Sequence, residues 1–238
     1  MSTSKRERLR QERIRQAQRE KRRRRLVIVS VCLVVLVAAV TTILVQMSRT
    51  KATSYAGDLA PVSVQEDGTV VMARSGTTKP VLDIYEDFQC PICKEFEHIN
   101  GAQIKQFAAE GKIKVVYHPI AFVNPQGSLR AAAAARCVPG DSWTAFHDEL
   151  FAKQPDERVA LTVDDLKKFA DGAGITDSAV LSCMESQRHA AQVQQYTQTA
   201  FSSGVQGTPT VLLDGRKLPD DQVLTSSGLR GTLENATK

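Results

Sequence analysis

The stretch YEDFQCPIC, residues 85–93, joins a strand-like segment to a C-x-x-C motif. Residues 80–88 (PVLDIYEDF) are rich in β-branched and aromatic residues, a composition that predicts a buried strand. From Pro91 to about Glu110 the apolar residues recur at helical spacing, and a glycine follows where a helix commonly stops. The motif is therefore predicted to lie at a strand-to-helix junction, with its first cysteine at the start of the helix.

A cysteine in this position has an unusually acidic thiol. Unpaired backbone N–H groups and the positive end of the helix dipole stabilise the thiolate, so its pKa falls below the usual value of about 8.5. Cys90 has this position, because Pro91 is favourable in the first helical turn and has no N–H to lose. Cys93 lies one turn further along, close enough to form a disulfide. We therefore predict that Cys90 is the attacking thiol and Cys93 the resolving thiol.

Two other interpretations of the motif are a permanent structural disulfide and half of a zinc site. Zinc would require two further ligands at suitable spacing. The remaining cysteines and histidines near enough to consider offer no second pair: Cys137, Cys183, His98 and His118. Redox chemistry without a metal or an organic cofactor is the expectation.

The segments on either side of the motif extend the prediction to a sheet. Residues 62–64 and 69–73 flank an Asp-Gly turn, a pattern that predicts a hairpin. After the motif's helix, residues 112–118 (KIKVVYH) predict a second strand. Two short strands at 210–213 and 216–218 precede a last helix near the C-terminus.

Between these strands, residues 127–204 are helical in pattern throughout. A capping-box sequence at 162–165 predicts the start of a short helix. A longer helix is predicted from residue 176 or 177 to Gly204. Trp143 falls on an apolar helical face and is expected in the core, whereas the four histidines show no pattern of partners.

With this order of elements the chain resembles the thioredoxin superfamily, and within it the DsbA-like thiol–disulfide oxidoreductases. The resemblance covers roughly residues 60–236. It rests on residues 85–93, on Tyr117-His118-Pro119, on the Ala-rich helix containing Cys137, and on Gly207-Thr208-Pro209-Thr210. The fold class that it implies is α/β, a thioredoxin fold in which residues 127–204 are a helical insertion.

The resemblance also implies roles for residues outside the motif. Pro209 should follow a cis peptide bond and lie beside the active cysteines, with the Thr208 backbone pairing to an extended substrate peptide. Cys137 and Cys183 are similar to the second, structural disulfide of some actinobacterial members. The alternative for these two residues is a pair of free, buried cysteines.

Two positions depart from the family pattern. Many DsbA-type enzymes have a His where Ile92 stands, and this His helps to stabilise the thiolate. Thioredoxin-like strands often carry a buried acid six residues before the nucleophile, where this chain has Ile84. Glu86 lies on the same face of the predicted strand. It is either a replacement proton acceptor or an ordinary solvated acid.

The N-terminal part of the chain has a different composition. Twelve basic and three acidic residues give residues 1–25 a net charge of +9, and the whole chain carries +5, so the remainder carries −4. Residues 26–48 contain no charge and as a helix would span about 35 Å, enough for a bilayer core of roughly 30 Å. A cleavable signal peptide is the alternative, but its apolar region is usually shorter. We expect a transmembrane anchor followed by a tether at 49–60 and a catalytic domain at 61–238.

The positive-inside rule predicts that residues 1–25 are cytoplasmic and that the domain is extracytoplasmic, where disulfides persist. The basic tail is then explained by orientation and anionic lipid, with no need for nucleic acid. The expected function is disulfide formation in exported proteins that carry free thiols. By family analogy, a quinone-linked membrane partner would reoxidise the enzyme. The alternatives are a reductase or isomerase, and a non-catalytic, membrane-tethered adaptor.

Overall fold

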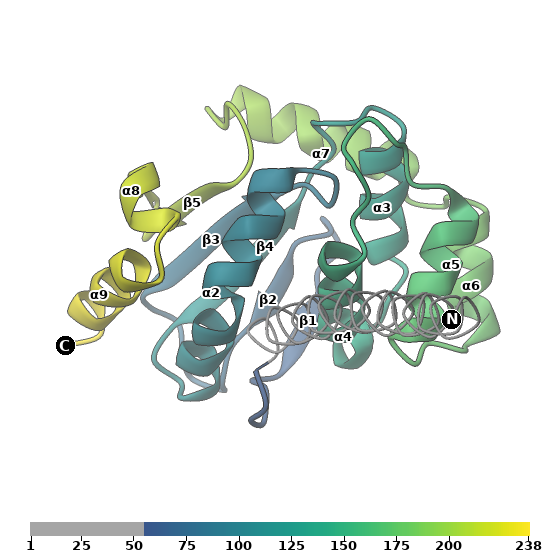
Figure 1. Ribbon diagram of the computed structural model, residues 1–238. Helices are drawn as coiled ribbons and strands as arrows, with labels where there is room; N and C mark the ends of the chain where they lie inside the picture. Colours follow the sequence, from purple (N-terminus) through teal and green to yellow (C-terminus); the bar gives the residue numbers. More distant parts are fainter. Residues whose placement is uncertain (1–54) are drawn as a thin grey trace, which may run out of the picture. The chain divides into compact units, whose positions relative to one another are not determined.

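The computed structural model describes residues 55–238, which form one six-stranded sheet covered by helices (Figure 1). The strands are β1 (Val62–Val64), β2 (Val70–Met72), β3 (Val81–Glu86), β4 (Lys114–Pro119), β5 (Thr210–Leu213) and β6 (Arg216–Lys217). The helices are α2 (Pro91–Ala109), α3 (Gly127–Ala135), α4 (Gly140–Ala152), α5 (Val163–Gly172), α6 (Ser178–Glu185), α7 (Ala190–Ser202), α8 (Asp220–Val223) and α9 (Ser226–Ala236). The predicted order of elements is confirmed.

The sheet order is β1-β2-β4-β3-β5-β6, with β3 and β4 parallel and the other neighbours antiparallel. Strand β3 is central, and its side chains alternate between partly and fully buried. Leu82, Ile84 and Glu86 all point into the core and are 0% exposed. Glu86 therefore shares the face of Ile84, and it is not a solvated acid.

The helical insertion differs from the prediction at one point. The single helix expected from residue 176 or 177 to Gly204 is wrong, because the chain forms two helices, α6 and α7. Gln187 lies between them with φ of +50°, in the left-handed region that no α-helix continues through. Neither Gly nor Pro marks this break, so the pattern of apolar residues alone did not reveal it.

A disulfide between Cys137 and Cys183 lies within this insertion. It links the chain just after α3 to α6, with the two Cα atoms 5.8 Å apart and 46 positions apart in sequence. The structure thus contains the pairing that the resemblance implied, and these two cysteines are not free.

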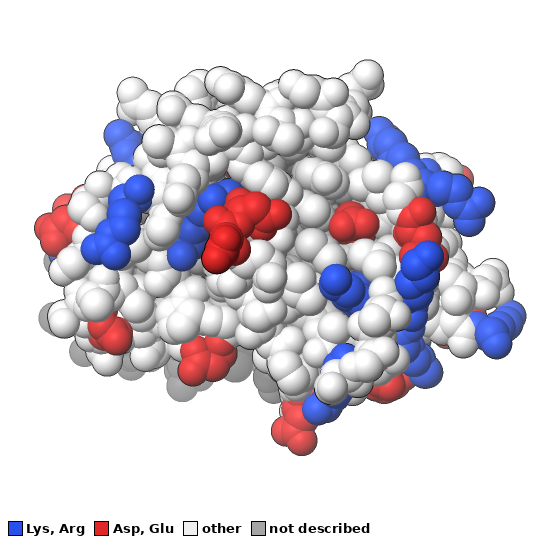
Figure 2. Space-filling model, turned by 180° about the vertical axis from the view of Figure 1, so that it is seen from behind, with Lys and Arg blue, Asp and Glu red and all other residues white. Residues whose placement is uncertain are grey.

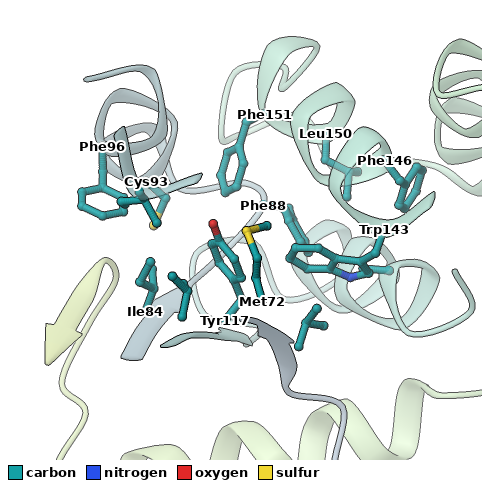
Figure 3. Packing of buried hydrophobic residues seen from close by; sticks show 14 of the residues in the cluster. Met72, Ile84, Phe88, Cys93, Phe96, Tyr117, Trp143, Phe146, Leu150 and Phe151 are labelled. Atoms are coloured by element: carbon teal, nitrogen blue, oxygen red, sulfur yellow. The ribbon is translucent and has the colours of Figure 1, made fainter. Parts of the chain in front are cut away.

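Much of the insertion shares one large hydrophobic core with the sheet (Figure 3). Trp143 is 1% exposed, as expected, and its ring lies 5.2 Å from that of Tyr117 on β4. Phe88 and Phe151 pack at a ring distance of 5.3 Å, which joins the end of the β3 segment to α4. Because buried aromatic side chains contribute strongly to core stability, α4 is fixed firmly against the strands.

The predicted basic tail, the anchor at 26–48 and the first half of the tether, residues 49–54, lie outside the described residues. Within residues 55–238, none of the helices combines the length and the apolar character needed to cross a membrane.

Candidate active site

Cys90 is the N-cap residue of α2, directly before Pro91 in the first helical turn. Its Sγ accepts a hydrogen bond from the backbone N–H of Cys93 at 3.4 Å. Both cysteines are free thiols, and both are buried: Cys90 is 4% exposed and Cys93 is 0% exposed. The sulfur that faces the helix start is therefore the one nearer the surface.

This environment lowers the pKa of Cys90 from 9.0 to about 6, chiefly because the Cys93 thiol donates a hydrogen bond to the Cys90 sulfur. Burial opposes the shift, since a thiolate is less well solvated inside the protein. The side chain of Thr208 and the backbone N–H groups of Ile92 and Cys93 lower the pKa further. Near neutral pH, Cys90 is mostly thiolate and can act as a nucleophile.

Cys93 has the opposite character. Burial raises its pKa well above 9.0, and the hydrogen bond to Cys90 and the charge of Cys90 add to this effect. A neutral Cys93 thiol beside a charged Cys90 is the division expected of an attacking and a resolving cysteine.

The chain before β5 lies against this pair. The Thr208–Pro209 peptide bond is cis, and in its protonated form the Cys90 thiol donates to the Thr208 carbonyl at 3.3 Å. The Thr208 hydroxyl is buried and makes no hydrogen bond within the described residues. Thr208 and Pro209 are themselves partly exposed. Thr208, 118 positions after Cys90 in the sequence, thus lies next to the Cys90 sulfur.

A buried carboxylate that the sequence did not single out holds the loop around the motif. Asp87 accepts hydrogen bonds from the backbone N–H groups of Gln89 (2.8 Å), Phe122 (2.7 Å) and Val123 (2.7 Å). Burial raises its pKa, although these hydrogen bonds oppose the shift. Asp87 therefore joins the loop after β3 to the loop after β4.

The insertion also forms hydrogen bonds with the motif and the residues just before it. Gln154, just after α4, donates from Nε2 to the carbonyl groups of Phe88 (2.9 Å) and Cys90 (3.0 Å). Gln89 bonds to the backbone of Val159 and Leu161 in the same loop. These contacts join residues more than 60 positions apart, so no local pattern could have revealed them.

Glu86 does not stand alone below the motif. Its Oε1 lies 3.0 Å from Nε2 of His147 on α4, and the His147 Nδ1 lies 3.2 Å from Asp148. Glu97 on α2 completes a group in which carboxylate oxygens and an imidazole nitrogen all lie within 4.8 Å of one another. The sequence showed no pattern of partners for the histidines, and the structure corrects this for His147. His118 also has partners, Asp83 and Tyr196.

This trio, Glu86, Glu97 and His147, is one of two groups in residues 55–238 whose spacing would allow a metal ion. The other consists of Cys137, Cys183 and His189, but its two sulfurs are bonded to each other. The trio is equally a network of proton-binding groups, since Glu86 and His147 already pair.

The surface around Cys90 is uncharged and carries several exposed apolar side chains. Ile92 is 53% exposed, Phe122 is 47% exposed and Phe201 is 37% exposed, and the two Phe rings lie 5.5 Å apart. Residues 88–93, 119–129 and 189–213 contain no Asp, Glu, Lys or Arg. Figure 2 shows the result as a broad white region along the upper edge of the molecule, where α7 lies in Figure 1. Such a surface suits an uncharged or apolar polypeptide segment.

A family model described as Thioredoxin matches residues 72–235. Among curated proteins, the chain is 28% identical over 162 residues to disulfide bond formation protein D of Bacillus subtilis, covering 66% of this chain and 68% of that protein. It is also 28% identical to the serine/threonine-protein kinase PknE of Mycobacterium tuberculosis, covering 65% of this chain and 30% of the kinase. The chain spans only a fifth to a third of the length of the first curated relatives that it matches.

Among solved structures, the reduced form of DsbA from Mycobacterium tuberculosis has 27% identity to this chain and a TM-score of 0.57. The match covers 76% of this chain and 92% of that one.

Proposed function

Since the chain belongs to the thioredoxin family, we propose that it is a thiol–disulfide oxidoreductase whose redox centre is Cys90-Pro91-Ile92-Cys93. The observation that carries this proposal is the contrast between the two thiols. The pKa of Cys90 is lowered to about 6, whereas that of Cys93 is raised above its ordinary value. A permanent structural disulfide has no need of such a contrast, but stepwise thiol exchange uses it.

The direction that we propose is oxidation of exported proteins. A substrate thiolate attacks the Cys90 sulfur of the oxidised enzyme, and the electron pair of the Cys90–Cys93 bond leaves on Cys93. The second substrate thiolate then attacks the substrate sulfur of this mixed disulfide and releases the Cys90 thiolate. Stabilisation of that thiolate favours the reduced enzyme and makes its disulfide a stronger oxidant.

Two observations on the surface around Cys90 support an extended peptide as substrate. Ile92, Phe122 and Phe201 expose apolar surface, and three stretches around Cys90 carry no charge. In this proposal the Thr208 backbone pairs with the peptide, Pro209 shapes that edge, and Glu86 serves the proton chemistry of Cys93. The similarity to proteins named DsbA and disulfide bond formation protein D agrees with such a substrate.

We further propose that residues 26–48 anchor the enzyme in the membrane, with the N-terminus cytoplasmic and the domain outside. The charge pattern of the sequence supports this topology. A quinone-linked membrane protein that accepts electrons from reduced Cys90 and Cys93 would complete the cycle.

Trapping of mixed disulfides tests the function. In Cys93→Ser, a mixed disulfide at Cys90 has no internal thiol to resolve it, so covalent complexes with exported proteins should accumulate. Cys90→Ser lacks the attacking thiol and is the matched control, in which few complexes should form. Equal trapping by the two variants would contradict the assignment of the nucleophile.

The redox state of Cys90 and Cys93 in cells distinguishes an oxidase from a reductase, an isomerase or an adaptor. We expect Cys90 and Cys93 to be mostly oxidised when cells are quenched with acid and alkylated. A mostly reduced pair would instead indicate a reductase or isomerase. A phenotype that is indifferent to loss of both cysteines would indicate an adaptor.

A further inference from the structure

A group of ionisable side chains is buried where α2, α4 and β3 meet. Glu86 on β3, Glu97 on α2 and His147 on α4 are at most 4% exposed. One ligand atom of each lies within 4.8 Å of those of the other two. Lys105 and Asp148 adjoin this group, with Lys105 Nζ 2.6 Å from both carboxylate oxygens of Asp148. Three carboxylates thus share one region of the core with a lysine and a histidine.

The charges of this group do not balance. With a neutral His147, three carboxylates face the single ammonium group of Lys105, which leaves an excess of two negative charges. Such an excess is strongly unfavourable in a protein interior, where buried charges need partners. A divalent cation bound by the carboxylates would cancel it. Two protons, one on Glu97 and one on His147, would cancel it as well, so the positions of the oxygen atoms must distinguish the two states.

Several buried oxygen atoms in this region lack a hydrogen-bond partner. Glu86 Oε2, Glu97 Oε1 and the Tyr117 hydroxyl oxygen are buried, and none of them is hydrogen-bonded within the described residues. The ring of Tyr117 lies 5.1 Å from that of His147, and in Figure 3 its hydroxyl points from the sheet toward the helices. An unpaired buried oxygen is unfavourable. Because one proton serves a single oxygen whereas a cation can bind several, these atoms favour a bound cation.

His147 is oriented as a metal-binding histidine is. Its Nδ1 lies 3.2 Å from Asp148 Oδ1, and its Nε2 lies 3.0 Å from Glu86 Oε1. A carboxylate that accepts the Nδ1 proton leaves Nε2 with a free lone pair, which is the usual arrangement behind a zinc-bound imidazole. Two ligands that are each about 2.1 Å from a tetrahedral Zn²⁺ lie roughly 3.4 Å apart, so Nε2 and Oε1 are already close to the separation that a shared ion requires.

We propose that Glu86, Glu97 and His147 bind one Zn²⁺ ion, with Asp148 as the carboxylate that orients His147. The ion is structural: it joins α2, which carries the motif, to β3 and to the insertion, and it takes no part in thiol exchange. Glu86 binds it through one oxygen and keeps the other for the role proposed above. This inference goes beyond the proposed function and does not depend on it.

The ligand atoms determine the class of cation. Ca²⁺ and Mg²⁺ are bound almost entirely by oxygen atoms, whereas an imidazole together with carboxylates suits Zn²⁺ and other divalent transition metals. Three protein ligands leave one tetrahedral position for the Tyr117 hydroxyl or for water. Zn²⁺ has no redox chemistry of its own, so it can remain bound while the nearby cysteines are oxidised and reduced.

Metal binding is measured on the oxidised full-length protein, purified with an affinity tag that contains no histidine. The pairs Cys90–Cys93 and Cys137–Cys183 are then disulfides, so none of these four sulfurs can bind metal as a thiolate. The protein is stripped with a chelator and titrated with Zn²⁺, and in parallel with Co²⁺ as a spectroscopic probe. Zn²⁺ should bind at about one ion per chain and raise the melting temperature. Co²⁺ should give visible bands without a thiolate charge-transfer band.

Variants test which side chains bind the ion. Asp148→Asn should weaken Zn²⁺ binding by about 10- to 100-fold, the usual effect of losing the partner of a metal-bound histidine, and Glu97→Gln should weaken it further. Without metal, Glu97→Gln should be at least as stable as the wild type, because it removes a buried charge. Zn²⁺ should reverse that order. Glu95→Gln, an exposed neighbour on α2, is the matched control and should bind Zn²⁺ as the wild type does.

Failure of the wild type to bind either ion would overturn the proposal and would show that protons balance the buried carboxylates. Equal binding by the wild type, Glu97→Gln and Glu95→Gln would also overturn it, because the ion would then lie elsewhere on the chain. If Glu97→Gln does not fold, His147→Gln replaces it, and the stoichiometry and Co²⁺ spectrum of the wild type still decide. Intact metal binding in a protein that exchanges no disulfides would support this site and refute the proposed function alone.

Discussion

The stability of the reduced protein should depend on pH through Cys90. Its pKa falls from 9.0 to about 6 in the folded protein, a difference of about three units, and each unit corresponds to about 1.4 kcal/mol. Because the folded pKa is the lower one, the stabilisation is fully present above pH 9 and is lost as the pH falls toward 6. Reduced protein should therefore gain about 4 kcal/mol of unfolding free energy over this range from Cys90 alone.

Comparison with Cys90→Ala isolates most of this contribution, since the titrating groups other than Cys93, whose pKa depends partly on Cys90, keep their surroundings in both proteins. Urea unfolding of the two reduced proteins, at intervals from pH 5 to pH 9.5, gives the difference directly. The wild type should become progressively more stable relative to the variant as the pH rises. Parallel curves that differ by less than 1 kcal/mol in their pH dependence would refute the reasoning that the fold stabilises the thiolate.

The same stabilisation affects the reduction potential. For a two-electron couple, about 30 mV corresponds to 1.4 kcal/mol, so three pKa units correspond to roughly 90 mV. Equilibration with glutathione should show a disulfide that is more oxidising by about this amount than a pair whose attacking thiol has an ordinary pKa.

Three other predictions follow from the motif, the second disulfide and the N-terminal sequence. Ile92→His should lower the Cys90 pKa and raise the reduction potential by some tens of millivolts, since a His offers a charge and a hydrogen-bond donor. Thiolate absorbance would measure the pKa and glutathione equilibration the potential. Unchanged values would mean that the start of α2 and Thr208 determine the stability of the thiolate. Replacing both Cys137 and Cys183 by Ala should lower the unfolding free energy by about 4 kcal/mol in the chain-entropy model. Of the four cysteines in the domain, mild reduction of the wild type should expose only Cys90 and Cys93 to alkylation, and equal labelling of all four would argue against a structural disulfide. Protease added to intact cells should digest a C-terminal tag and spare an N-terminal one, and the reverse result would remove the proposed topology.

Much of the fold could be predicted because its signals are local. The capping box at Thr162 and Asp165 is present at the start of α5 as the sequence predicted. Pro91 begins α2, and the left-handed Gly111 follows its end. The break between α6 and α7 was missed because the residue in the left-handed region is Gln187, a type that does not mark such positions. Its conformation depends on how the insertion packs.

The candidate site divides in the same way. Cys90 and Cys93 are evident from the motif, and their different chemistry follows from the start of one helix. Glu97 and His147 were not evident, since a Glu or a His on an amphipathic helix is ordinarily solvated. What makes them significant is the approach of α4 to α2 and β3, a long-range contact that no spacing encodes.

The insertion therefore does more than cover a thioredoxin core. Through α4 it contributes His147 and Asp148 to the buried polar group around Glu86, and through Gln154 it binds the backbone carbonyl of Cys90. The burial that raises the pKa of Cys93 depends partly on these elements, and a neutral Cys93 donates the hydrogen bond that lowers the pKa of Cys90. The low pKa of Cys90 thus depends on the exclusion of water from Cys93. A change in α4 that admitted water beside Cys93 should consequently raise the pKa of Cys90.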